Sequence, residues 1–67
     1  MNCEQLASRI KSLMYQIALM EDQLDDLKKQ PRTTEVIQKI DDLENQINDM
    51  KKDVIRLNNL FKQNCKN

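Results

Sequence analysis

Sixty-seven residues form one small unit, near the lower size limit at which a chain buries enough apolar surface to fold alone, so a partner is expected. Charged residues make up 33% of the chain, Gly, His and Trp are absent and Pro occurs once, which favours helices and disfavours strands. Lys plus Arg equals Asp plus Glu, at 11 each, so no net positive field draws the chain to nucleic acid or to an anionic membrane. The expected partner is therefore a protein.

The first half of the chain has the apolar spacing of a heptad helix. From Cys3 onward, apolar residues recur in alternating steps of three and four, which is typical of the buried seam between two helices. Pro31 occupies the next seam position, removes a backbone donor and disfavours helix at the residue before it. We therefore expect a helix over about 3–30 and a turn over about 31–34. The seam residues of this helix are Leu6, Ile10, Leu13, Ile17, Met20, Leu24 and Leu27.

A second apolar series follows the turn in a different frame. Continuing the first frame would reach Gln38 and Asp41, so one uninterrupted stripe cannot include both series. Thr33 or Thr34 is a suitable N-cap for the second helix, with Glu35 in its first turn. We expect this helix over about 35–65. Its seam residues are Val36, Ile40, Leu43, Ile47, Met50, Val54, Leu57 and Phe61.

The two seams match in the way that an antiparallel hairpin requires. From the pair Leu27 and Ile40 to the pair Leu6 and Phe61, the residue numbers of facing seam residues add to 67. The predicted fold is all-α: a single domain, 1–67, forming an antiparallel two-helix coiled-coil hairpin that self-association or a partner completes to a three- or four-helix bundle. The alternative is a kinked parallel coiled coil, since Ile10 and Ile17 occupy one seam class and leucines the other.

Cys3 and Cys65 lie at opposite ends of the sequence, and a hairpin brings these ends together. They can form a disulfide that closes a long loop, worth about 4 kcal/mol on loop-entropy grounds. The alternative is a pair of reduced thiols at the helix ends. In a reducing cytoplasm the reduced pair is expected, whereas an exported or virion-borne protein would favour the disulfide.

The residues that enzymes and metal sites need are missing. Without His, a cysteine has no partner to stabilise its thiolate, and two cysteines cannot complete a zinc site within one chain. Without Gly, the chain has neither a phosphate-binding loop nor an EF-hand. We expect no catalytic residue, no cofactor, no metal and no small-molecule substrate, and hence no enzyme.

Charge is distributed unevenly along the predicted hairpin. Residues 20–49 carry nine acids and four bases, whereas the two flanking stretches together carry two acids and seven bases. Folding back at Pro31 makes the turn end acidic and the terminal end basic, about 45 Å apart at 1.5 Å per residue. The alternative interpretation is two solvated helices without a docking role. The residues of the acidic end are Glu21, Asp22, Asp25, Asp26, Asp41, Asp42 and Glu44.

Several apolar residues lie off the seam, and all of them except Ile37 fall in the half of the hairpin that carries the termini. They exceed what a two-stranded seam covers, which indicates a second apolar surface for a partner, with Tyr15 as a candidate anchor. Scattered surface hydrophobes are the alternative. The residues of the predicted surface are Ala7, Met14, Tyr15, Ala18, Leu19, Ile55 and Leu60.

In size and layout the predicted hairpin resembles the co-chaperones of type III secretion needles and the bacterial sporulation phosphatases. The phosphatases carry a Ser-Gln-Glu-Leu-Asp run in their second helix, which the stretch 39–44 does not reproduce, so no family is assigned.

The function expected from the sequence is a protein-interaction module, such as a small adaptor, co-chaperone-like or regulatory protein. Its partner is a second copy, with a dimer favoured, or a helix of another protein. Two alternatives remain: a structural segment that oligomerises a larger assembly, and a small inhibitor that occludes a basic site with its acidic turn end. With no apparent signal peptide and no apolar run of membrane-spanning length, the expected location is the cytoplasm.

Overall fold

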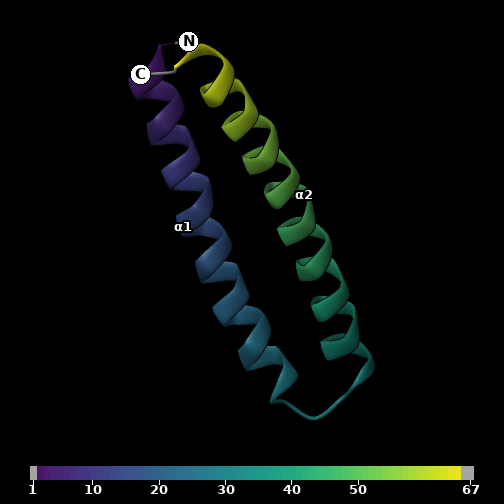
Figure 1. Ribbon diagram of the computed structural model, residues 1–67. Helices are drawn as coiled ribbons and strands as arrows, with labels where there is room; N and C mark the ends of the chain where they lie inside the picture. Colours follow the sequence, from purple (N-terminus) through teal and green to yellow (C-terminus); the bar gives the residue numbers. More distant parts are fainter. Residues whose placement is uncertain (1, 66–67) are drawn as a thin grey trace.

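The chain folds into two antiparallel helices joined by a short turn, as the matched seams predict. A computed structural model describes residues 2–65, with α1 at Cys3–Lys28 and α2 at Thr34–Asn64. The two helices run side by side along their whole length, and both chain ends lie at the same pole (Figure 1). The rod measures 50 × 15 × 14 Å, close to the expected length. The chain doubles back on itself, so the alternative of a kinked parallel coiled coil is wrong.

Helix α1 begins and ends where local hydrogen bonding changes. The side chain of Asn2 caps its start, because Oδ1 accepts a hydrogen bond of 2.8 Å from the backbone N–H of Gln5. The helix ends at Lys28, about two residues before the predicted end. The backbone N–H groups of Lys29 and Gln30 bond instead to the carbonyls three residues before them, at 3.2 and 3.1 Å. This tightening fits the restriction that Pro31 places on the preceding residue.

Helix α2 is capped by the first of the two candidate threonines. Thr33 Oγ1 accepts a hydrogen bond of 3.3 Å from the backbone N–H of Val36, and Thr34 is already helical rather than part of the turn. At the other end the helix stops at Asn64, so Cys65 lies just outside it. The Asn64 side chain donates a hydrogen bond of 3.0 Å to the carbonyl of Leu60, which satisfies one of the free carbonyls of the last turn.

The core is a single line of side chains between the helices. All fifteen predicted seam residues have reduced exposure. The buried ones are Leu6, Ile10, Leu13, Ile17, Ile40, Ile47 and Leu57, and the partly buried ones are Met20, Leu24, Leu27, Val36, Leu43, Met50, Val54 and Phe61. The main cluster lies near the termini, where Leu6, Ile10, Leu13 and Leu57 pack together, with Cys65 against them.

This core is too thin to enclose any side chain completely. Even Ile47, the least exposed core residue, keeps 4% of its surface accessible. The chain exposes 5406 Å², whereas a compact monomer of 8.0 kDa exposes about 4,450 Å². The hairpin therefore carries roughly 950 Å² more surface than a compact protein of its mass.

Candidate functional site

A shallow groove between the helices opens on one side of the terminal half. Ala7, Ile10 and Lys11 of α1 line it, together with Asn58 and Phe61 of α2. Ile10 and Phe61 are seam residues whose edges the groove leaves accessible, and Ala7 is partly buried. The floor of the groove is therefore apolar, with one lysine and one asparagine at its borders.

A second groove continues along the same side toward the turn. Its lining includes Glu21 and Lys51, whose side chains form an ion pair of 3.4 Å across the two helices, and Glu44. Glu21 lies fourteen residues after Ala7, and Lys51 lies seven residues before Asn58. Residues spaced by whole heptads share one face of a helix, so both grooves belong to one side of the hairpin. We call this the groove side.

The seven off-seam apolar residues do not form one continuous surface. At 3.6 residues per turn, four of them lie on the groove side. Tyr15 and Leu19 lie farther round α1 on its outer face, and Leu60 lies on the side opposite the grooves. The groove-side residues are Ala7, Met14, Ala18 and Ile55.

The exposed fractions show which of these side chains are free to contact a partner. On the groove side Met14 is 55% exposed and Ile55 is 61% exposed. Tyr15 is 67% exposed, Leu19 45% and Leu60 41%, but each lies away from the grooves. Met14 and Ile55 are therefore the large apolar contacts that the terminal half of the groove side offers.

The opposite side of the hairpin is more polar than the groove side, although the exposed Leu60 lies on it. Arg9 and Gln16 directly precede seam residues of α1, and Asp53 directly precedes a seam residue of α2, which places all three opposite the grooves. Asp53 also accepts a hydrogen bond of 3.4 Å from Arg56 one turn along the same helix. Of the two long sides of the rod, the groove side is thus the more apolar one.

The acidic and basic residues separate along the rod as the charge count predicts. All seven residues of the predicted acidic end are exposed, near the turn, and Asp42 accepts a hydrogen bond of 3.0 Å from Gln38. On the groove side itself, Lys11 lies toward the termini, whereas Asp25 and Glu44 lie toward the turn. One basic residue of the terminal end, Lys66, lies outside the described residues.

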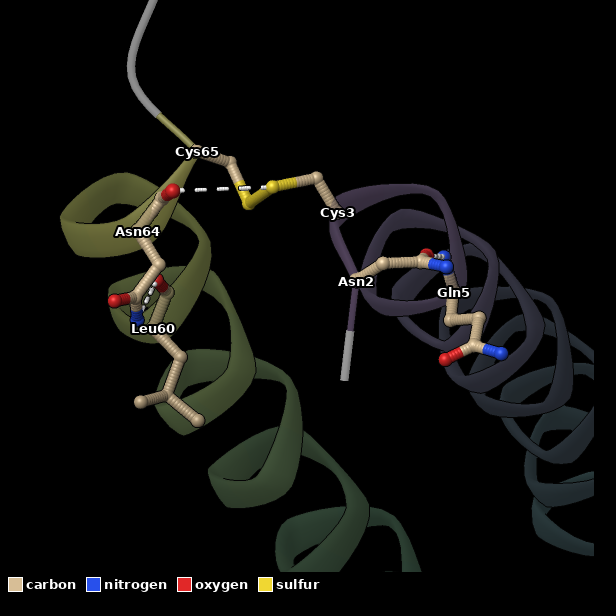
Figure 2. The surroundings of a disulfide bond; sticks show 6 residues. All are labelled: Asn2, Cys3, Gln5, Leu60, Asn64 and Cys65. Atoms are coloured by element: carbon tan, nitrogen blue, oxygen red, sulfur yellow. Dashed lines mark hydrogen bonds between the residues drawn. A yellow bond between two sulfur atoms is a disulfide. The ribbon is translucent and has the colours of Figure 1, made fainter.

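The two cysteines are joined by a disulfide at the pole opposite the turn. Their Cα atoms lie 5.8 Å apart, although 62 positions separate them in the sequence. Figure 2 shows the bond running from the first residue of α1 to the residue just after α2. Cys3 Sγ also lies 3.8 Å from the carbonyl oxygen of Asn64, a contact that links the end of α2 to the start of α1. Of the two alternatives that the sequence left open, the structure has the disulfide.

The predicted surface omitted the polar border of the terminal groove, Lys11 and Asn58, and also Ile37, which the sequence placed apart at the turn end. Ile37 is 51% exposed. The heptad positions next to the seam indicate on which of the two sides of the rod each surface residue lies. The surface was predicted only from the position of each residue along the rod, without its angle around the helix.

No helix formed by residues 2–65 combines the length and apolar character needed to cross a bilayer. Within the same range, no cluster of three or more His, Cys, Asp or Glu side chains forms an arrangement that would hold a metal ion. Comparison with protein families, curated proteins and solved structures finds no match for this chain.

Proposed function

We propose that the chain is a non-enzymatic protein-interaction module that binds a helical partner along its groove side. The observation that carries this proposal is the contrast between its two long sides. One side has two grooves, with the exposed Met14 and Ile55 beside them, whereas the other carries Arg9, Gln16 and Asp53 and one large exposed apolar residue near them, Leu60. A third helix laid on the groove side would cover the accessible edges of Ile10 and Phe61.

The surface area of the hairpin supports the same proposal. Each partner of a standard protein interface contributes about 800 Å². The excess surface of this rod over a compact protein, roughly 950 Å², is of that size. A partner on the groove side would therefore give the molecule the ratio of buried to exposed surface that compact proteins have.

Photo-crosslinking at single positions tests the proposal. Ile55, on the groove side, and Leu60, on the opposite side, are replaced one at a time by p-benzoylphenylalanine in the full, oxidised chain. Irradiation in the purified protein and in an extract of the native source is expected to give protein adducts from position 55 and few from position 60. Mass spectrometry of the adducts identifies the chain bound. Equal adduct yields at the two positions, or none at either, would overturn the proposal.

A second candidate function rests on the acidic turn end. Its exposed carboxylates would suit an inhibitor that covers a basic site on another protein. Binding through this end would weaken strongly between about 50 and 500 mM salt, because the Debye length falls severalfold over a range of that order. Binding along the apolar groove side would change much less.

The cellular location is part of the same proposal. The sequence favours the cytoplasm, whereas the disulfide favours an oxidising compartment, since such bonds persist where thiols are not kept reduced. We give the disulfide more weight, because the fold itself brings Cys3 and Cys65 together. Alkylation of the protein taken directly from its source, followed by mass measurement, decides between the two. An unmodified chain indicates the oxidising compartment, and addition of two alkyl groups indicates the cytoplasm.

A further inference from the structure

The charges on the groove side identify a partner. The geometry points to a second copy of this chain, laid antiparallel over the groove side so that the turn end of one hairpin covers the terminal end of the other. This inference rests on the proposed function, because it names the occupant of the same surface.

The inference follows from the position of each charged residue along the rod, which we call its level. Ala18 lies near the middle of the rod, on the groove side of α1. Lys11 lies seven residues from Ala18 toward the termini, about 10 Å along the axis at 1.5 Å per residue, and Asp25 lies seven residues from it toward the turn. Whole heptads separate these three residues, so they share one face of α1. The two-fold axis that opposes the groove sides of two antiparallel copies lays α1 on α1 and α2 on α2. At the level of Ala18, this axis brings Lys11 of each copy opposite Asp25 of the other.

The same axis brings apolar residues together. Ala18 lies at its level and Met14 lies four residues away, so both residues lie at the centre of the interface. The axis places Ile37, which is exposed at the turn end of one copy, beside the terminal groove of the other copy, which Phe61 lines. Lys51 also lies near the axis, but its charge is paired with Glu21 of its own chain at 3.4 Å.

Other arrangements of two copies place like charges together. Hairpins packed in parallel about a two-fold axis would lay α1 on α2, and would oppose Asp25 of each copy to Asp41 and Glu44 of the other. An antiparallel pair that overlapped only in the terminal halves would oppose two basic surfaces. Only the full antiparallel overlap pairs the basic half of each groove side with the acidic half of the other, and like charges placed opposite one another at an interface weaken association.

The closed two-fold symmetry makes a charge-reversal test sharp, because each contact occurs twice. In a dimer of the Lys11→Glu variant, two acids face each other at both contacts, and in a dimer of Asp25→Lys two bases do. Mixing the two variants creates a heterodimer in which both contacts are complementary. Sedimentation of the oxidised chains is expected to show dimerisation weakened by at least about tenfold in each variant alone, and restored to within about threefold of the original in the mixture.

Control variants separate this contact from a general effect of charge. Arg9→Glu and Gln23→Lys introduce the same charges near the same levels on the opposite side of the rod. They are expected to leave dimerisation unchanged, and circular dichroism confirms that all four variants keep their helix content. Dimerisation that the mixture fails to restore overturns the antiparallel arrangement.

A further outcome distinguishes this inference from the proposed function. An original chain that sediments as a monomer at all concentrations overturns self-association. If position 55 still crosslinks to another protein in the extract, the groove side remains a binding surface and only the identity of its occupant is wrong. If position 55 forms no adduct, the proposed function is wrong as well.

Discussion

Replacing Ile47 by Asp is expected to unfold the hairpin. Ile47 is the least exposed core residue, at 4%, and an aspartate there would place a carboxylate between the two helices without a partner. We expect a loss of about 4 kcal/mol or more. The whole stability of a chain of this size is about 3–10 kcal/mol at the usual value per residue. Denaturant unfolding followed by circular dichroism measures the change.

Asn45→Asp is the matched control for this prediction. It introduces the same side chain two residues away, at an exposed position on the outer face of α2. It is expected to change the free energy of unfolding by less than about 0.5 kcal/mol. An Ile47→Asp variant as stable as this control would show that the seam is not the core.

Removing the disulfide is expected to have the second largest effect. The bond between Cys3 and Cys65 closes a loop over a sequence separation of 62, and the loop-entropy relation gives about 4 kcal/mol for its constraint on the unfolded chain. In a chain of this size, 1 kcal/mol shifts the melting temperature by about 4–8 °C. The double variant Cys3→Ser/Cys65→Ser is therefore expected to melt more than about 15 °C below the oxidised protein.

Chemical reduction provides the control for the cysteine variant. The original chain in excess reductant should melt close to the double serine variant, and the variant itself should not respond to reductant. A melting temperature that stays within about 2 °C in both experiments would contradict a stabilising role for the bond. The helix ends would then meet without help from the cysteines.

The hairpin could be predicted from the sequence because two independent patterns agree on it. The heptad spacing defines a buried stripe on each helix, and the single proline separates the stripes at the point where their facing residues match. The helix ends were less certain, because caps depend on hydrogen bonds that several neighbouring residues can make. Thr33 and Thr34 offer the same hydroxyl, and the structure uses Thr33.

The candidate site was only partly predictable. The spacing of Met14 and Ile55 shows that they lie off the seam. Whether they lie on the same side of the rod depends on their angles around the two helices. Leu19 and Leu60 are also exposed apolar residues of the terminal half, yet they lie away from the grooves. The disulfide could not be predicted from the sequence alone, because the state of two thiols depends on the redox conditions as well as on their proximity.

The most direct test of the whole account is small-angle X-ray scattering from the oxidised chain at dilutions where the forward intensity corresponds to a single chain of 8.0 kDa. Doubling back after Lys28 predicts a longest dimension near 50 Å. The same helical residues in one straight rod would measure about 90 Å at 1.5 Å per residue. A single chain with a longest dimension close to 90 Å would contradict the hairpin, the closure of its ends and the groove side that depends on both.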